Sequence, residues 1–260
     1  MSMQTVMVYS EAGGVSKTTT AVSIAMTAAE SGREVILIDL DPRAATTKWL
    51  RAKPAGEGLD VGAILGAKDE DPEGWAEDMA VPSGWNPRLR VIPSARSVSN
   101  READRDDYAE LRLRTSLEGV SADVVVIDCP NRQGGPLTLS ALNAADTVLY
   151  AATASDSGVD GVEGAQRTIE AFKRSRERMG APTQLHEAGI AVTRDGTGFL
   201  SIPEQDAIDQ LREAATLIEP IVPHLAIVPE VRLAGEWYGN YRKGAAIRDA
   251  YAEIMREVIR

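Results

Sequence analysis

A lysine and a run of hydroxyl residues follow a glycine-containing turn near the start of the chain. The turn is Gly13-Gly14-Val15-Ser16, and Lys17-Thr18-Thr19 come directly after it. In a phosphate-binding P-loop, backbone N–H groups and a helix N-terminus wrap the phosphates, the lysine reaches the outer ones, and the next hydroxyl holds Mg²⁺. The usual pattern has glycine where this chain has Glu11 and Ser16. A plain Gly-Gly turn, with Lys17 in solvent, is therefore the alternative.

Two aspartates follow apolar runs that are typical of buried parallel strands. Asp41 comes just after the run Val35–Ile38, and Asp128 comes directly after Val124–Ile127. Open α/β sheets bind ligands at the edge where such strands end. P-loop chemistry needs a carboxylate for Mg²⁺ and a group that orients water, so we assign these tasks to Asp128 and Asp41, respectively. The alternatives are a cap of the next turn for Asp128 and an Asp-Pro turn for Asp41.

Strand and helix patterns alternate along the whole chain. Strands are expected at 5–9, 34–40, 89–93, 124–127, 147–153, 188–193 and 225–228. Helices are expected from the loop to Gly32 and at 46–52, 61–65, 75–79, 100–117, 137–144, 159–179, 202–218 and 244–259. The alternation predicts an α/β fold: one domain over residues 1–260, with a mainly parallel twisted sheet and helices on both faces. Residues 53–88 are expected to form an elaborated surface region.

Composition excludes several classes of protein. A net charge of −11 argues against a protein that coats nucleic acid with its whole surface. The single cysteine, Cys129, excludes an internal disulfide and a multi-cysteine metal site within one chain. His186 and His224 are far apart in the sequence and are expected to be ordinary surface or packing residues. No apolar run has the length of a membrane span and no signal pattern is present, so we expect a cytoplasmic protein without a membrane partner.

The motifs resemble those of the ParA/MinD group of P-loop ATPases, and within it the ParA-type DNA partition ATPases. The resemblance is carried by residues 12–19, 35–42, 123–130, 138–146 and 227–233. It implies an ATPase that binds ATP with Mg²⁺, forms a homodimer on ATP binding and coats double-stranded DNA non-specifically. It also implies association with the nucleoid and a ParB-like centromere-binding partner that stimulates hydrolysis.

The same resemblance implies roles for individual residues. Lys17 and Thr18 hold the phosphates and Mg²⁺, Asp41 positions the attacking water, and Asp128 supports Mg²⁺ through water. The base is expected near Thr193, Pro229 and Val231. The full set of implied nucleotide-binding residues is Gly13, Gly14, Val15, Ser16, Lys17, Thr18, Thr19, Thr193, Pro229 and Val231.

Two departures from the family pattern bear on activity. Ala12 replaces a signature lysine, and Arg132 is the first candidate to replace its charge, with Arg43 the second. Ser16 replaces a loop glycine, which strains the backbone if that position needs a positive φ. These departures keep a hydrolysis-deficient nucleotide-binding scaffold open as an alternative function.

The basic residues expected to contact DNA lie in two clusters. They include Lys173, Arg174, Arg242, Lys243 and Arg248. Acidic residues are interspersed, so solvated helix faces are the alternative. A MinD-like positioning protein is a further alternative, because the chain ends in an amphipathic helix. The apolar stripe of that helix is expected to pack on the sheet rather than on a membrane.

Overall fold

The computed structural model describes residues 3–68, 70–195 and 197–260, which contain a sheet of order β3-β4-β2-β5-β1-β6-β7-β8. β3 is antiparallel to β4, and all the other neighbouring strands are parallel. The strands are β1 (Gln4–Tyr9), β2 (Val35–Asp39), β3 (Val81–Pro82), β4 (Leu89–Ile92), β5 (Val124–Asp128), β6 (Thr147–Thr153), β7 (His186–Asp195) and β8 (Leu217–His224). This architecture confirms the expected α/β class with a mainly parallel sheet.

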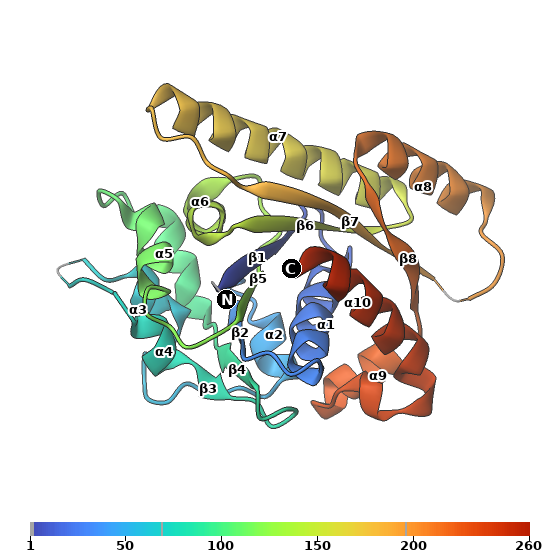
Figure 1. The fold of residues 1–260 in the computed structure, drawn as a ribbon, viewed down its shortest axis with the longest axis horizontal. Helices are drawn as coiled ribbons and strands as arrows, with labels where there is room; N and C mark the ends of the chain where they lie inside the picture. Colours follow the sequence, from blue (N-terminus) through green and yellow to red (C-terminus); the bar gives the residue numbers. More distant parts are fainter. Residues whose placement is uncertain (1–2, 69, 196) are drawn as a thin grey trace.

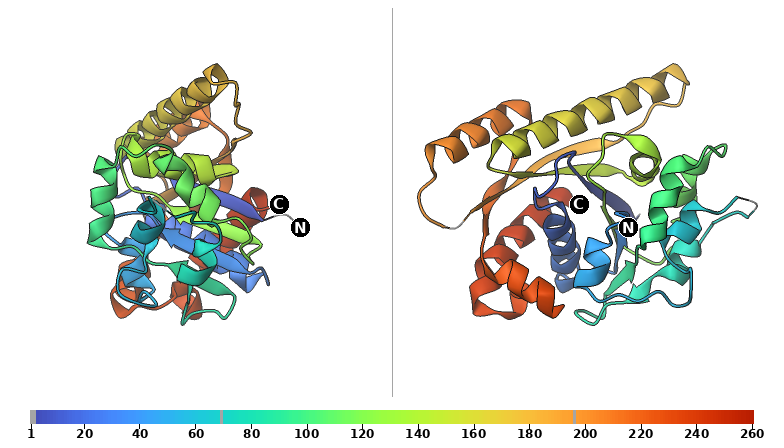
Figure 2. Two further views of the ribbon diagram at one scale, coloured as in Figure 1. Left: turned by 90° about the vertical axis from the view of Figure 1, so that its left-hand side faces the viewer. Right: turned by 180° about the vertical axis from the view of Figure 1, so that it is seen from behind.

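Helices cover both faces of the sheet. Figures 1 and 2 show α1 and α10 on one face and α6, α7 and α8 on the other. The α-helices are α1 (Lys17–Glu30), α2 (Ala45–Trp49), α3 (Val61–Leu65), α4 (Trp75–Met79), α5 (Arg112–Ser116), α6 (Gly135–Ala144), α7 (Asp156–Arg178), α8 (Ile202–Ala214), α9 (Ile227–Ala234) and α10 (Ala245–Val258). Short 3₁₀ helices are η1 (Arg96–Ala103), η2 (Ala109–Leu111), η3 (Tyr238–Asn240) and η4 (Arg242–Gly244).

The central strand β1 shows how the sheet joins two hydrophobic cores. Its side chains alternate between faces, as strand geometry requires. Val6 and Val8 are buried in the core that contains α1 and α10, whereas Met7 and Tyr9 are buried in the core that contains α6 and α7. A strand that is apolar on both faces therefore anchors the loop that follows it between two packed layers.

The expected strand at 225–228 and the expected end of α8 at 218 are wrong. α8 ends at Ala214, the strand is β8 (Leu217–His224), and residues 227–234 form α9. β8 contains Pro220 and Pro223, which argue against a strand when only the sequence is considered. The sheet tolerates them because β8 is an edge strand that pairs with β7 alone.

The expected continuous solvated helix at 100–117 is also wrong. The segment contains the end of η1, then η2 and the five-residue helix α5. Arg112 is only 8% exposed, and its guanidinium donates to the carbonyl of Leu65 at 2.8 Å and pairs with Asp106 at 3.3 Å. In sequence these charged residues look like a solvated helix face, but Arg112 attaches the segment to the end of α3.

The C-terminal helix α10 packs as expected. Its apolar residues Tyr251, Ile254, Met255 and Val258 are buried in the core shared with α1. The side-chain amide of Gln4 donates to the carbonyl of Val258 at 2.9 Å and ties the end of the helix to β1. None of the described helices is long and apolar enough to cross a membrane.

Candidate nucleotide-binding site

Neighbouring strands bring the predicted site residues to one edge of the sheet. β5 pairs with both β1 and β2, and the register sets Asp39 opposite Asp128. The glycine-containing loop follows β1, and α1 begins at Lys17. Asp128 and Asp41 both act electrostatically on Lys17. The lysine and the two predicted acids therefore lie close together although they are distant in the sequence.

Lys17 is held inside the loop rather than in solvent. Lys17 is 8% exposed, and its Nζ donates a hydrogen bond to the carbonyl of Ala12 at 2.6 Å. Burial lowers the pKa of Lys17, while the negative charges of Asp128 and Asp41 act to raise it. This geometry contradicts the alternative of a solvated lysine after a plain turn, and it sets a buried amine where a phosphate chain would be wrapped.

Asp128 has the surroundings of a carboxylate that supports a metal ion. It is 1% exposed, and Oδ2 accepts a hydrogen bond from the Thr46 hydroxyl at 2.8 Å. Burial raises the pKa of Asp128 to about 6, whereas the hydrogen bond from Thr46 and the nearby Thr18 hydroxyl act to lower it. Within the described residues its buried Oδ1 has no hydrogen-bond partner. An unpaired buried carboxylate oxygen beside the Thr18 hydroxyl fits a water-coordinated Mg²⁺, which prefers oxygen ligands and retains its waters.

Asp41 takes part in a turn and also lines the site. Its Oδ1 accepts a hydrogen bond from the backbone N–H of Arg43 at 2.8 Å, and its carbonyl accepts one from Ala44 at 2.8 Å. The Asp-Pro turn considered as an alternative is thus present. This turn does not exclude the expected role of Asp41 in orienting water, since Asp41 also lines the cavity around the loop.

Asp39 is a site residue to which the sequence analysis gave no role. It is completely buried, and its carboxylate accepts hydrogen bonds from the Thr47 N–H (2.8 Å), the Thr47 hydroxyl (2.7 Å) and the Asp41 N–H (3.2 Å). Burial, followed by the charge of Asp128, raises the pKa of Asp39 to about 7. Asp39 therefore holds the start of α2 and the Asp41 turn in place. The two acids in the run Asp39-Leu40-Asp41-Pro42 were the available signal.

The glycine-containing loop encloses a cavity of about 270 Å³ at this edge. The cavity is lined by Gly13, Gly14, Val15, Ser16, Lys17, Thr18, Thr19, Asp41, Arg43, Ala45, Cys129, Asn131, His224 and Arg232. His224 was expected to be an ordinary surface or packing residue; it is exposed, and it also lines this cavity. It reaches the cavity from the end of β8, a strand that the sequence analysis did not predict.

Ser16 has the positive φ that the sequence analysis considered. Its φ is +64°, a left-handed conformation that costs roughly 1–2 kcal/mol for a residue with a Cβ. The hydroxyl of Ser16 accepts a hydrogen bond from the Thr193 hydroxyl at 3.0 Å. Thr193 is 3% exposed, so the expected base-binding residue on β7 lies directly against the loop.

The other two residues expected near the base lie on α9. Val231 is 3% exposed and packs in the core with α1 and α10. Pro229 lines a second, shallower cavity beside Trp49. Neither is among the described residues that line the cavity at the loop.

The two candidates for the missing lysine charge differ in position. Arg132 pairs with Glu102 at 3.5 Å, and its carbonyl accepts a hydrogen bond from the Tyr9 hydroxyl at 2.8 Å. It is not among the described residues that line the cavity, whereas Arg43 is.

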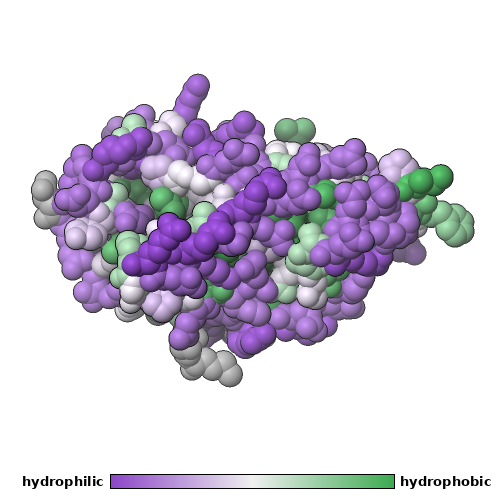
Figure 3. Space-filling view, turned by 90° about the horizontal axis from the view of Figure 1, so that it is seen from above, coloured by the Kyte–Doolittle hydropathy of each residue, from purple (hydrophilic) through white to green (hydrophobic). Residues whose placement is uncertain are grey.

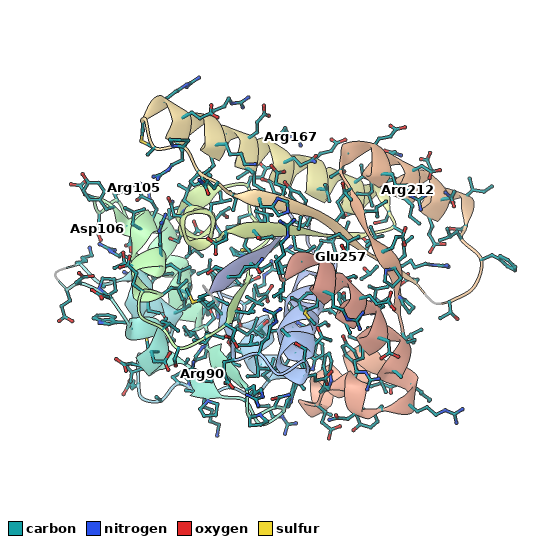
Figure 4. All side chains as sticks on the ribbon, in the orientation of Figure 1. Arg90, Arg105, Asp106, Arg167, Arg212 and Glu257 are labelled. Carbon is teal, nitrogen blue, oxygen red and sulfur yellow. The ribbon has the colours of Figure 1, made fainter. Side chains whose placement is uncertain are left out.

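Most of the predicted DNA-contacting residues are paired with acids. Lys173 pairs with Glu187, Arg174 with Glu170, and Arg248 with Asp249. Two arginines labelled in Figure 4 are paired in the same way: Arg167 on α7 with Glu163, and Arg212 on α8 with Asp209. Arg242 and Lys243 are exposed, and no carboxylate pairs with either of them in the described part of the chain.

Comparisons with known proteins agree with the motifs and the fold. Residues 3–180 match a family model described as "AAA domain". The chain is 31% identical to the chromosome partitioning protein ParA of Myxococcus xanthus over 196 residues, which are 72% of this chain and 63% of that protein. It is 30% identical to the chromosome partitioning protein ParA of Caulobacter vibrioides over 260 residues, which are 97% of this chain and 92% of that protein.

Solved structures share the fold at lower identity. Apo McdA from Cyanothece superposes with a TM-score of 0.79 at 22% identity and covers 97% of this chain and 99% of its own. Cobyrinic acid a,c-diamide synthase from Mycobacterium smegmatis, with a bound ATP analogue and magnesium, gives 0.77 at 24% identity and covers 98% of this chain and 93% of its own. At these identities the likeness establishes the fold alone.

Proposed function

This chain belongs to the AAA-domain family as a ParA-type ATPase, and on that premise we propose that it binds Mg·ATP and hydrolyses it to ADP and phosphate. One observation carries the proposal: Lys17 and Asp41 line the loop cavity at the edge of the sheet, and the buried carboxylate of Asp128 acts electrostatically on Lys17 from beside it. A protein that only needed a Gly-Gly turn has no reason to keep a buried amine and two acids around that turn.

Each residue has a defined task in this mechanism. Lys17 exchanges its hydrogen bond to the Ala12 carbonyl for oxygens of the outer phosphates, and the loop N–H groups bind the remaining phosphate oxygens. The Thr18 hydroxyl and, through water, Asp128 would hold Mg²⁺, which would supply positive charge to the phosphates. Asp41 orients water at the terminal phosphate. Thr193 and His224 line a cavity together with Gly14 of the loop, and we place the base there rather than beside Pro229 and Val231.

Phosphate release measured with and without non-specific DNA tests the proposal. We expect slow release that rises when DNA is added. Lys17→Ala should abolish nucleotide binding because the buried cation is lost, whereas Asp41→Ala should retain binding and stop turnover. Equal nucleotide affinity of the wild type and Lys17→Ala would contradict the phosphate role.

The surface around the cavity supports pairing of two chains on ATP binding. Phe199 and Ile202 are 104% and 87% exposed, and Phe199 lines a cavity of about 680 Å³ that also includes Gly14. Figure 3 shows hydrophobic atoms protruding at the end of the molecule where the β7–α8 loop lies in Figure 1. Exposed apolar residues beside a nucleotide site are typical of an interface. Sedimentation with and without ATP tests the pairing, and Ala12→Lys should change it.

Non-specific DNA is the proposed surface on which the protein acts, with nucleoid association in the cytoplasm and a ParB-like stimulating partner. The two ParA relatives support this role. Arg242 and Lys243 are the favoured DNA contacts because neither has an acidic partner among the described residues, whereas Lys173 and Arg174 are paired with glutamates. Arg242→Ala with Lys243→Ala should weaken DNA binding and reduce its salt dependence. The matched pair Lys173→Ala with Arg174→Ala should leave both nearly unchanged.

A hydrolysis-deficient scaffold is the second candidate. Ala12, which carries no charge, and the left-handed Ser16 favour it. The phosphate-release measurement separates the two functions, because a scaffold binds nucleotide and releases no phosphate under any condition.

A further inference from the structure

Although the protein as a whole is acidic and Asp128 lies buried beside the loop, the residues that line the nucleotide cavity carry more positive than negative charge. Among the described residues that line it, the cations are Lys17, Arg43 and Arg232, and the only acid is Asp41. The whole chain carries a net charge of −11. Three cations gathered at one cavity in such a chain indicate an anionic ligand there.

Arg43 is fixed at the same end of the cavity as Asp41. Its backbone N–H donates to the Asp41 carboxylate at 2.8 Å, and its carbonyl accepts a hydrogen bond from Lys48 Nζ at 2.6 Å. Its charge acts on Lys17, where it lowers the pKa of the amine. Since Asp41 is the residue proposed to orient water at the terminal phosphate, Arg43 lies at the terminal end of the phosphate chain.

Arg232 reaches the cavity from α9, which lies near the C-terminal end of the sequence. Its guanidinium carbon lies 5.8 Å from the centroid of the Trp49 ring, within the range of a cation–π contact. Trp49 is completely buried, and its indole N–H donates to the carbonyl of Glu236 at 3.0 Å. The arginine therefore rests on a rigid support. Together with Arg43 it also lines the neighbouring cavity over α2 and α9, so both arginines border the same side of the site.

In the described part of the chain, no carboxylate forms an ion pair with either guanidinium. We propose that Arg43 and Arg232 bind the terminal phosphate of the nucleotide within the same subunit and so distinguish a triphosphate from a diphosphate. The proposal rests on the proposed function, because it concerns the same cavity. Guanidinium groups suit this task, since they stay charged and donate several hydrogen bonds to phosphate oxygens.

Calorimetric titration with a non-hydrolysable ATP analogue and with ADP, both with Mg²⁺, tests the proposal. We compare the wild type with Arg43→Ala, with Arg232→Gln, which keeps a side chain long enough to cover Trp49, and with Arg256→Ala. Arg256 is exposed on α10, outside the cavity lining, and serves as the control. Each cavity variant should bind the triphosphate analogue about 10- to 100-fold more weakly, with ADP affinity within about twofold of the wild type.

The possible results separate this proposal from the proposed function. If both cavity variants keep the wild-type ratio of triphosphate to diphosphate affinity, the terminal-phosphate role is wrong, while nucleotide binding by the wild type still supports the ATPase. Equal weakening of both nucleotides also overturns the role. A wild-type protein that binds neither nucleotide overturns both proposals. Thermal unfolding of Arg43→Ala should match the wild type because Arg43 is exposed, and that of Arg232→Gln should stay close to the wild type because glutamine still covers Trp49.

Discussion

Gly161 on α7 forms the rigid support of the glycine-containing loop. Its carbonyl accepts a hydrogen bond from the Glu11 N–H at 3.1 Å. A Cβ added at Gly161 would lie 2.5 Å from the Ser10 hydroxyl, 2.7 Å from the Ala12 Cβ and 3.0 Å from the Ala12 nitrogen. The helix approaches the loop so closely that a methyl group at this position must displace backbone.

The structure and helix propensity predict opposite effects of Gly161→Ala on the free energy of unfolding. Propensity alone predicts a gain of about 1 kcal/mol in the free energy of unfolding. Overpacking against backbone typically costs about 1–3 kcal/mol. We therefore expect a net loss of up to about 2 kcal/mol, together with a roughly tenfold loss of nucleotide affinity because the loop shifts.

Urea unfolding and calorimetric nucleotide titration provide the two measurements. Gly84→Ala is the control, since nothing lies within 4 Å of a Cβ added there, and it should change stability by less than about 0.5 kcal/mol. If Gly161→Ala is more stable than the wild type and binds nucleotide equally well, the idea that α7 supports the loop is refuted.

Two further predictions concern strain and charge. Ser16→Gly should be more stable than Ser16→Ala by about 1 kcal/mol in urea unfolding. Both variants lose the hydrogen bond from Thr193, but only glycine avoids the cost of a positive φ. Equal stabilities of the two variants would argue against strain at this position. Burial acts to raise the pKa of Glu187, but hydrogen bonds from Lys173 and Tyr150 outweigh it and hold the pKa below the usual 4.5. A lowered folded-state pKa gives stability that is present above pH 4.5 and lost as the pH falls below it, so Glu187→Gln should destabilise the protein more at pH 7 than at pH 3. An equal loss of stability at the two pH values would contradict this role of the charge.

Local sequence patterns were sufficient for the parts of the site that lie next to one another in the chain. The apolar run of β1, the loop with Gly13 and Gly14, and Lys17 occur within a few residues, so their spacing predicts a strand, a turn and a helix directly. The same holds for Asp128, because an acid after four apolar residues indicates the end of a buried strand. These features follow from the pleat of a strand and the start of a helix, which depend on near neighbours.

The remaining features depend on contacts between distant segments. Thr46 bonds to Asp128 across 82 positions, and this contact, with the register of β2 against β5, determines the surroundings of both buried acids. The local pattern favours a helix end at the first residues of β8 and no element over the rest, because only its place at the sheet edge makes its prolines acceptable. That strand and α9 bring His224 and Arg232 to the cavity. The sequence by itself predicted which residues would bind phosphate and metal, and the tertiary structure decided which distant cations lie beside them, because strand order and helix packing set distances that no local pattern encodes.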